Sequence, residues 1–372
     1  MTIGFDISML MYEGSGVATY TKHLILNLVK YYPQNQYKLF YSSLRKPHAY
    51  FDFLNKIGTK AEVFTYHIPP RFLNYVWNTH SILSIQSLIG DMDIYHSSDY
   101  LRPPLKPTVK GVTTLHDLTW KKYPQYHTKD IVELHSRKMK KTIKYKDTII
   151  VDSANTKKDL LYYFPAAVKN KIHVLYPGIS DLHGAGNSKN KIKNVLKKYK
   201  VPFTHKFLLY VGAIEPRKNL ETAIKTFHRF IQEKQYQNFT FLFIGRAGWK
   251  NDNIFAQISN LHLQNKIQFV GYVDDADLPC FYQAASALVY LSHYEGFGLP
   301  PLEASRCGTP SLLYKNSSMA ETFPANYPFA SRGDELLALK SLLEKKPPLA
   351  FAKKFTWKNY VDRYINILST QV

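Results

Sequence analysis

The sequence predicts an α/β protein of two domains, each built on a parallel β-sheet with helices on both faces. Short β-rich runs alternate with helical stretches along most of the chain, which is the pattern of parallel sheets. This alternation pauses near residue 178 and then resumes. In addition, 372 residues exceed what one hydrophobic core usually holds. The predicted architecture is therefore two Rossmann-like, doubly wound domains that face a central cleft.

The first domain is expected over residues 1–178. Short runs rich in β-branched and aromatic residues predict strands at residues 3–7, 38–41, 93–96, 109–115, 148–152 and 172–175. Apolar residues with the spacing of one helix face predict helices at residues 17–29, 71–89, 131–144 and 156–163.

The second domain is expected over residues 179–354. Tyr176-Pro177-Gly178 and a Gly-, Asn- and Lys-rich stretch at residues 184–200 indicate an interdomain segment. The alternation then resumes at residues 207–211, 220–233, 240–244, 266–270, 274–285, 287–291 and 310–313. Ligands of such sheets bind beyond the carboxyl ends of the strands, so residues that follow strands are the candidates for function.

Composition indicates a globular protein of the cytoplasm. Hydrophobic residues make up 45% of the chain and aromatic residues 15%, which suits large cores. Cys280 and Cys307 are too few for a disulfide framework and have no metal-ligand neighbourhood, which favours a reducing compartment. The N-terminal MTIGFDISML predicts a strand rather than a signal peptide. The sequence contains no run of eighteen apolar residues, so no membrane-spanning helix is predicted.

The net charge of +21 requires either an anionic partner or a solvated basic surface. Basic residues concentrate at residues 137–146 and 189–200, but aromatic residues are not interleaved with them, so no nucleic-acid partner is expected. An anionic membrane stays open because residues 71–89 are amphipathic and carry Phe72, Tyr75 and Trp77. Burial of this stretch against its own domain is the commoner outcome.

Residues 290–316 are the most informative segment of the chain. Glu295 and Glu303 lie eight positions apart across a turn rich in glycine and proline. A helix beginning near Pro300 would direct its free N–H groups at that turn, which suits a diphosphate. The carboxylates would then accept hydrogen bonds from sugar hydroxyls. Alone, this spacing is more often an ordinary turn with two solvated glutamates.

Four further motifs follow predicted strands. The Gly14-Ser15-Gly16 turn opens a helix, and its amides could hold phosphate or sugar oxygens. His116 could bind a sugar hydroxyl or act in acid–base chemistry, although a lone histidine there is more often simply packed. Arg217-Lys218 places two cations at a helix N-terminus, where the helix dipole disfavours positive charge. A bound diphosphate would offset this repulsion. Gly245-Arg246-Ala247-Gly248-Trp249 could receive the base or ribose.

Together these motifs resemble a known enzyme family over nearly the whole chain. The matching residues are Asp6 with Gly14-Ser15-Gly16, Tyr95-His96-Ser97-Ser98, Leu115-His116-Asp117-Leu118, Val151-Asp152-Ser153 with Asp159-Leu160, Tyr176-Pro177-Gly178, Val211-Gly212 with Glu215-Pro216-Arg217-Lys218-Asn219-Leu220, Gly271-Tyr272-Val273, Tyr294 to Pro300 with Glu303-Ala304, Asn316-Ser317-Ser318 with Glu321, and Phe355-Thr356-Trp357. The chain resembles the retaining family 4 glycosyltransferases of GT-B fold, which include bacterial mannosyl- and glucosyltransferases. It departs from many members at Ala213, where they have arginine, and at Asp152, where a small residue is common.

The resemblance implies roles for the matching residues. Arg217 and Lys218 would neutralise the diphosphate of a nucleotide-sugar donor, so no metal ion or other cofactor is expected. Glu303 would accept a hydrogen bond from the ribose. Glu295 would bind the transferred sugar, together with the amides of residues 297–299, which are Phe297, Gly298 and Leu299. His116 would contact the donor sugar near the reacting centre.

In the same way, the turn of Gly14 and Gly16 would approach the diphosphate, and Gly245 with Arg246 would lie at the donor. The last segment, residues 355–372, is expected to form a helix that crosses back to the first domain. Anomeric configuration is expected to be retained by a front-face path, because Glu303 is committed to the ribose and no nucleophile is evident on the opposite face.

The favoured donor is GDP-mannose, followed by a UDP-hexose, and the acceptor is expected to be a glycan or a lipid-linked glycan. No residues can be assigned to the acceptor from the sequence. The protein is expected in the cytoplasm, with peripheral attachment to the inner membrane face left open. Alternatives are a sugar phosphorylase or UDP-GlcNAc epimerase of the same fold, or a non-catalytic basic adaptor for a membrane or nucleic acid.

Overall fold

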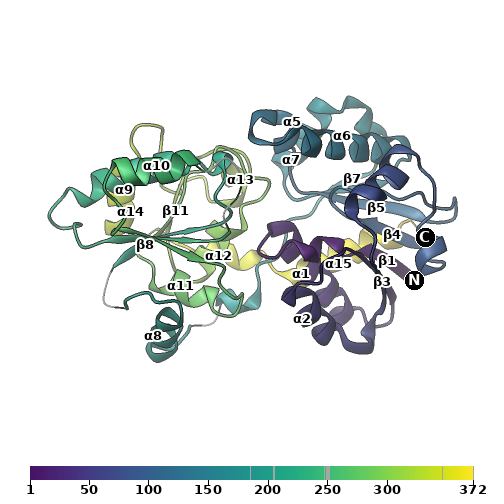
Figure 1. Ribbon diagram of the computed structural model, residues 1–372, viewed down its shortest axis with the longest axis horizontal. Coiled ribbons are helices and arrows are strands. Elements are labelled where there is room, and N and C mark those ends of the chain that lie inside the picture. Colours follow the sequence, from purple (N-terminus) through teal and green to yellow (C-terminus); the bar gives the residue numbers. More distant parts are fainter. Residues whose placement is uncertain (185, 204–205, 247, 249–251, 346, 372) are drawn as a thin grey trace. The chain divides into compact units, whose positions relative to one another are not determined.

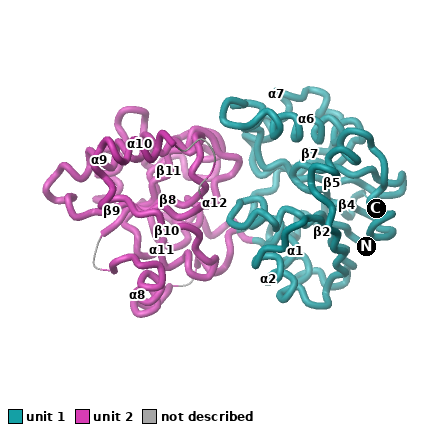
Figure 2. Tube along the Cα trace, viewed as in Figure 1, with its two compact units in different colours: residues 1–178, 357–372 teal, residues 179–356 magenta. Residues whose placement is uncertain are grey.

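The computed structural model describes residues 1–184, 186–203, 206–246, 248, 252–345 and 347–371. The chain forms two compact units (Figures 1 and 2). The first unit comprises Met1–Gly178 and Trp357–Val372, and the second comprises Ile179–Thr356. The prediction of two parallel-sheet α/β domains is confirmed.

The first unit contains a seven-stranded sheet in the order β3-β2-β1-β4-β5-β6-β7, and all neighbouring strands are parallel. Its strands are β1 (Thr2–Asp6), β2 (Gln36–Ser42), β3 (Glu62–Tyr66), β4 (Ile94–Ser97), β5 (Lys110–Leu115), β6 (Thr148–Val151) and β7 (Ile172–Val174). The strand order reverses between β1 and β4. Loops that leave the carboxyl ends of these two strands diverge, and the crevice they leave is where such sheets bind ligands.

The second unit repeats this plan with five parallel strands in the order β10-β9-β8-β11-β12. They are β8 (Phe207–Val211), β9 (Thr240–Ile244), β10 (Ile267–Gly271), β11 (Ala287–Tyr290) and β12 (Ser311–Leu313). Every residue of β8 and β11 is buried, as expected for central strands covered on both faces. Here the order reverses between β8 and β11.

Helices cover both faces of each sheet (Figure 1). In the first unit they are α1 (Gly16–Tyr31), α2 (His48–Ile57), α3 (Pro70–Leu73), α4 (Gln86–Ile89), α5 (Thr119–Lys122), α6 (Lys129–Lys144), α7 (Ala154–Tyr163) and α15 (Trp357–Ser369). In the second they are α8 (Lys189–Lys198), α9 (Leu220–Ile231), α10 (Asp252–Asn260), α11 (Leu278–Ala284), α12 (Leu299–Arg306), α13 (Met319–Thr322) and α14 (Glu335–Glu344). Ser15, Thr128, Ser153 and Ser188 begin four of them as side-chain caps that accept a backbone N–H.

The C-terminal helix α15 completes the core of the first unit. The chain leaves that unit after Gly178 and returns after Thr356, two residues beyond the predicted boundary at residue 354. Val361 and Leu368 of α15 are fully buried in the same cluster as β1 and α1. Tyr364 donates or accepts a hydrogen bond of 2.7 Å at His96 Nδ1, which joins α15 to β4.

Residues 71–89 do not form the single amphipathic helix that the sequence predicts. Helix α3 continues into a π-helical turn at Asn74–Thr79, and α4 begins only at Gln86. Between them Ser81 and Leu83 have positive φ angles of 57° and 63°, which no regular helix allows. Trp77 is fully buried, and its indole N–H donates to the Leu83 carbonyl at 3.0 Å, so the chain turns around this side chain.

The lysine-rich stretch that the sequence predicts between the domains belongs instead to the second unit. Residues 189–198 form helix α8 of the second unit, capped by Ser188 and anchored by buried Val195 and Leu196. The sequence analysis missed helices α2, α10 and α14 and strand β3. An acidic residue in the first turn, Asp252 in α10 and Glu335 in α14, was the available signal for two of these helices.

Candidate functional site

The switch point of the second sheet holds a network of four charged side chains. Lys218 Nζ lies 2.6 Å from Glu295 Oε1, and Arg217 Nη1 lies 3.0 Å from Glu295 Oε2. Arg217 Nε also lies 2.6 Å from Glu215 Oε1. Lys218, Glu215 and Glu295 are each at most 6% exposed. The structure therefore brings together three of the four predicted catalytic residues.

Each carboxylate oxygen of Glu295 faces a different cation, and this arrangement controls its ionisation. Although burial alone would raise it, the charges of Lys218 and Arg217 lower the pKa of Glu295 to about 2. Burial, and then the charge of Arg217, lower the pKa of Lys218. Lys218 also donates to the Tyr290 hydroxyl at 2.8 Å. Glu295 is thus a carboxylate at any physiological pH.

Backbone geometry places the two cations at the end of β8. The loop after this strand makes a short 3-10 turn, Pro216–Lys218, before α9 begins at Leu220. Asn219 has the left-handed φ of 55°, which asparagine tolerates, and its side-chain amide donates to the Leu291 carbonyl at 3.0 Å. Asn219 therefore ties the cation-bearing loop to the end of β11, where the Glu295 loop starts.

A second loop supports Glu295 from the other side. Ser317 Oγ accepts from the Glu295 backbone N–H at 3.0 Å, and Ser318 Oγ donates to the Glu295 carbonyl at 3.1 Å. Asn316 Nδ2 donates to the carbonyls of Ser292 and His293. The Asn316-Ser317-Ser318 motif thus fixes the backbone on which Glu295 stands.

The glycine turn after Glu295 leads directly into α12. Gly298 precedes this helix with φ of 85°, and a Cβ there would lie 2.1 Å from the Met319 side chain. The helix begins at Leu299, with Pro300 in its first turn, as the sequence predicts. Phe297 is 5% exposed and packs edge-on against Phe355.

Glu303, on α12, has a separate set of partners. It accepts a hydrogen bond of 2.9 Å from the Tyr282 hydroxyl and lies 3.9 Å from His183 Nε2. His183 is 4% exposed, and neither ring nitrogen has a hydrogen-bond partner among the residues that the structure describes. The sequence analysis missed His183 and Tyr282, because nothing along the chain brings either to Glu303.

The loop after β9 approaches the loop after β8. Gly245 has φ of 138°, and a Cβ there would lie 2.1 Å from the Gly212 carbonyl oxygen. The Arg246 carbonyl accepts from the Ile214 N–H at 3.1 Å. Only glycine at position 245 permits the loop to lie this close to Gly212, so the packing alone accounts for Gly245 and no ligand is needed to explain it. Ala247 and Trp249 of the predicted motif lie outside the described residues.

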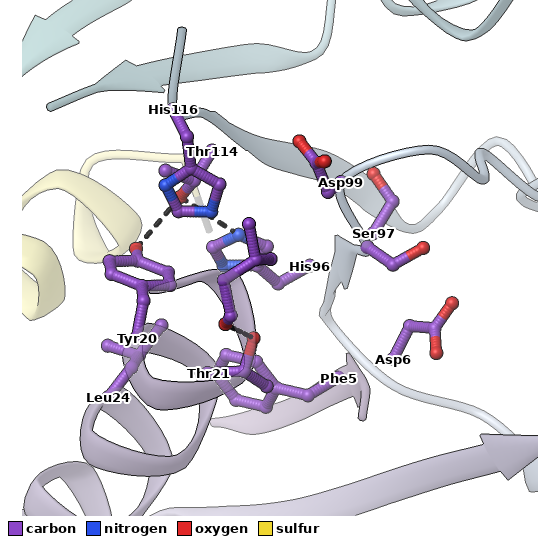
Figure 3. A pocket seen from close by; sticks show the side chains of 12 residues that line it. Phe5, Asp6, Tyr20, Thr21, Leu24, His96, Ser97, Asp99, Thr114 and His116 are labelled. Atoms are coloured by element: carbon purple, nitrogen blue, oxygen red, sulfur yellow. Dashed lines mark hydrogen bonds between the residues drawn. The ribbon is translucent and has the colours of Figure 1, made fainter. Parts of the chain in front are cut away.

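The switch point of the first sheet forms a polar cavity (Figure 3). Its polar lining comes from the ends of β1, β4 and β5 and from α1: Asp6, Tyr20, Thr21, His96, Ser97, Ser98, Asp99, Thr114 and His116. Asp6 is 4% exposed, and its Oδ2 has no hydrogen-bond partner within the described part of the chain. Polar residues directly after β4 were the available signal for this cavity.

His116 stands at one wall of this cavity. Its Nδ1 lies 2.6 Å from Asp152 Oδ2, and its ring meets the edge of Tyr20 at a centroid distance of 4.7 Å. Asp152, one of the two departures from the family pattern, thus contacts the predicted catalytic histidine.

The glycine turn before α1 has the conformation that its sequence suggests. Gly14 has a positive φ of 70°, which favours glycine. Gly16 is the first residue of α1, and a Cβ at this position would have no atom within 4 Å. Gly16 therefore leaves open space beside the turn, and a role for this turn at the diphosphate stays a prediction.

Two further properties concern metals and membranes. Within the described ranges, no group of three or more His, Cys, Asp or Glu side chains has an arrangement that could hold a metal ion. Among the same residues, no helix combines the length and apolar character that crossing a bilayer requires.

Solved structures with the same fold define its class. Sucrose-phosphate synthase from Thermosynechococcus elongatus superposes with a TM-score of 0.75 at 17% identity, covering 100% of this chain and 98% of that one. The lipopolysaccharide-biosynthesis glycosyltransferase WaaG superposes with a TM-score of 0.69 at 14% identity, covering 97% and 95%. The fold is that of a GT-B glycosyltransferase.

Sequence relationships identify the family. The family described as "Glycosyltransferase Family 4" matches residues 14–181, and "Glycosyl transferases group 1" matches residues 190–333. The O-antigen chain mannosyltransferase B of Escherichia coli is 28% identical over 284 residues, 73% of each chain. The O-antigen chain mannosyltransferase RfbU of Salmonella typhimurium is 27% identical over 298 residues, 78% of this chain and 75% of that one. The chain belongs to the family 4 glycosyltransferases, and it is an enzyme that transfers a sugar.

Proposed function

We propose that this enzyme transfers mannose from GDP-mannose to a glycan or lipid-linked glycan, with retention of anomeric configuration and without a metal ion. The observation that carries the proposal is the Arg217–Lys218–Glu295 network at the switch point of the second sheet. Mannose is favoured over other hexoses by the two O-antigen mannosyltransferases that resemble this chain. A UDP-hexose is the second choice, since a neighbour of the same fold binds UDP-glucose.

In this reaction, the bond between the sugar C1 and the β-phosphate oxygen breaks as the acceptor hydroxyl forms a new bond to C1 on the same face. The acceptor's proton passes to the departing phosphate oxygen. Arg217 and Lys218 stabilise the negative charge that grows on the diphosphate, the task that a metal performs elsewhere. Two of the three Lys218 N–H donors are used by Glu295 and Tyr290, which leaves one for a phosphate oxygen.

Glu295 binds hydroxyls of the transferred sugar rather than attacking C1. Both of its oxygens are engaged by cations and its pKa is low, so it is a weak nucleophile. Glu303, whose Oε2 is oriented by Tyr282, is assigned to the ribose. Retention then follows from the front-face path and requires no covalent glycosyl-enzyme.

The donor and the reaction are tested together. A thermal-shift panel of UDP, GDP, ADP and their sugar conjugates without metal should show a raised midpoint with GDP ligands. A ligand at one hundred times its dissociation constant contributes about 2.7 kcal/mol of stability. NMR of the product from GDP-mannose, with and without EDTA, then reports anomeric configuration and metal dependence. Release of mannose 1-phosphate on addition of phosphate, or epimerised UDP-GlcNAc, would instead identify the phosphorylase or the epimerase.

A peripheral contact with an anionic membrane is favoured by one further observation. The basic helix α6 packs along the segment that follows α3: Arg137 donates to Thr79 at 3.2 Å, and Lys141 donates to the Trp77 carbonyl. Phe72 of α3 and Tyr75 of the following segment are 54% and 58% exposed. Apolar side chains beside basic ones suit the surface of an anionic bilayer.

Flotation with phosphatidylglycerol vesicles should therefore recover the protein, and pure phosphatidylcholine vesicles should not. The double variant Phe72→Ser with Tyr75→Ser should lose flotation, whereas exposed Tyr162→Ser on α7 should keep it. Equal recovery of both variants would refute this contact.

A further inference from the structure

His116 and Asp152 form a hydrogen-bonded pair whose acidic member has no part in the transfer described above. His116 follows β5 and Asp152 follows β6, and these two strands are parallel neighbours in the first sheet. Their side chains meet at 2.6 Å, from His116 Nδ1 to Asp152 Oδ2. Asp152 is 4% exposed, so solvent hardly screens this contact.

The pairing determines which ring nitrogen of His116 can meet a ligand. Burial raises the pKa of Asp152, while the charge and hydrogen bond of His116 lower it. In its ionised form the carboxylate only accepts hydrogen bonds, so Nδ1 then carries a proton and donates it to Asp152. Nε2 is then the remaining polar atom of the ring, and it forms no hydrogen bond to any residue that the structure describes. His116 lines the polar cavity of the first unit (Figure 3) and keeps 18% of its side chain exposed.

Other contacts hold both members of the pair in place. The ring of Tyr20 meets the imidazole nearly at right angles, with an interplanar angle of 77°. Asp152 lies immediately before Ser153, whose Oγ accepts the Thr156 N–H at 3.0 Å and so begins α7. The Asp152 carboxylate is therefore attached to a junction of strand and helix, not to a free loop. Its other oxygen, Oδ1, is buried and has no hydrogen-bond partner among the described residues.

We propose that Asp152 is a positioning residue for His116: it holds Nδ1 protonated and keeps Nε2 directed into the cavity, where Nε2 binds a hydroxyl group of the sugar. The identity of that ligand rests on the proposed function, whereas the pairing itself does not. The carboxylate of Asp152 supplies an orienting contact that a small side chain could not make.

Charge adds to this orientation. Burial lowers the pKa of His116, but the carboxylates of Asp152, Asp99 and Asp117 outweigh it and raise the pKa above its usual value. The other titratable groups near the ring are Tyr20 from α1, His96 from β4 and His135 from α6, and burial lowers the pKa of His135. The pKa of His96 is lowered to about 3 by burial, so His96 adds no positive charge. His116 is thus favoured as an imidazolium that donates from Nε2 to a sugar oxygen.

Histidine NMR on the full chain tests the pairing without any turnover. The signal of His116 is assigned by its loss in His116→Gln, and its pKa is measured in wild type, Asp152→Asn and Asp159→Asn. The asparagine of Asp152→Asn would still accept from Nδ1 but has no charge, so the pKa of His116 should fall by about one unit or more. Asp159 is a matched control, a buried aspartate on α7 paired with Lys122 at 3.1 Å, and its replacement should leave that pKa unchanged. An unchanged pKa in Asp152→Asn overturns the proposal.

The kinetic arm tests the consequence for the ligand. In Asp152→Asn the decline of kcat/KM at high pH should shift to lower pH by as much as the pKa of His116 falls in the NMR measurement. A shift of one unit lowers kcat/KM about tenfold near neutrality, because less of His116 is protonated. Asp152→Glu, which restores the charge, should recover part of the loss and return the profile toward wild type. A uniform loss with an unshifted profile would indicate packing alone and refute the positioning role. If no donor is turned over by wild type, the proposed function fails, and the NMR result still decides the pairing.

Discussion

The two units bring opposite kinds of electrostatic environment to equivalent positions of their sheets. At the switch point of the second sheet, two cations and two carboxylates neutralise one another within hydrogen-bonding distance. At the switch point of the first sheet, Asp6 and Asp99 line a cavity to which none of the described lysines and arginines contributes. The same backbone plan therefore presents two cations in one unit, which suit the proposed diphosphate, and carboxylates in the other, which suit the proposed sugar hydroxyls.

This difference shows how a doubly wound sheet acquires its chemistry. The fold supplies strand ends, helix N-termini and a crevice in both units, whereas the side chains that follow β8 and β11 determine that two cations meet in the second unit. Glu295 holds Lys218 and Arg217 in place before any ligand arrives. Preorganised cations of this kind avoid a reorganisation cost during the reaction.

The largest effect that should separate the two units is on stability. Glu295→Gln leaves the buried Lys218 beside a neutral amide, and breaking a buried pair in this way costs about 3–5 kcal/mol of unfolding free energy. Urea denaturation measures the loss, and the exposed Glu344→Gln is the control with no expected change. A loss below about 1 kcal/mol, the usual range of a surface pair, would mean that the cations do not depend on Glu295.

The next largest effect is on turnover. Lys218→Ala removes a donor to the leaving diphosphate and should lower kcat by about 10²–10³-fold, as loss of one charge-stabilising donor does elsewhere. Steady-state kinetics with saturating donor measure it. Lys198→Ala, on α8, removes an exposed lysine that pairs with Asp274 and should keep wild-type turnover. Wild-type turnover in Lys218→Ala contradicts the assignment.

Lowering the pH should change the stability contributions of Glu295, in the second unit, and Asp6, in the first unit, in opposite directions. The pKa of Glu295 is lowered from 4.5 to about 2, so its stabilising contribution is present above pH 4.5 and is lost as the pH falls toward 2, at about 3 kcal/mol in total. Burial raises the pKa of Asp6, so Asp6 instead favours the folded state more as the pH falls. Stability measured between pH 5 and 2 should therefore decline less steeply in Glu295→Gln than in wild type, and more steeply in Asp6→Asn. Parallel curves for all three proteins would contradict both assignments.

The smallest of these effects concerns the donor alone. Glu303→Ala removes the proposed ribose acceptor and should weaken GDP binding by about 10- to 150-fold, the range for a hydrogen bond to a charged group. Calorimetric titration measures the affinity, and kcat at saturating donor should stay near that of wild type. Tyr282→Phe, which removes only the hydroxyl that holds Glu303, should show the same change in smaller degree. An unchanged affinity for GDP in Glu303→Ala would contradict the ribose role and leave Glu303 with a purely structural one.

Local patterns were enough to predict much of the fold. The central strands β8 and β9 lie at the predicted residues, because each is a short apolar run followed by a glycine, which is typical of a buried strand. The segment 71–89 was predicted wrongly for a physical reason. Its apolar spacing suits one helix, but Trp77 is buried against Phe40 and its carbonyl accepts from Lys141, and both of these residues lie far from it along the chain.

In the candidate site, too, some residues were predicted from the sequence and others were found only in the structure. Glu295, Glu303, Arg217, Lys218 and His116 were selected from the sequence because each follows a predicted strand or opens a helix. Their partners were not. Asp152 lies 36 residues after His116, and Tyr282 lies 21 residues before Glu303, so only the pairing of strands and the packing of helices bring them together.

The amino-acid sequence alone was therefore sufficient for the two-domain α/β class, the glycosyltransferase family and the residues at the strand ends, because periodicity and short motifs are properties of neighbours in the chain. How those residues pair emerged only in three dimensions. Lys218 and Arg217 share the two oxygens of Glu295, Glu303 turns to Tyr282, and Asp152 contacts His116. The reason is that ionisation and hydrogen bonding depend on distance and burial, which parallel sheets set by joining strands that are distant in sequence.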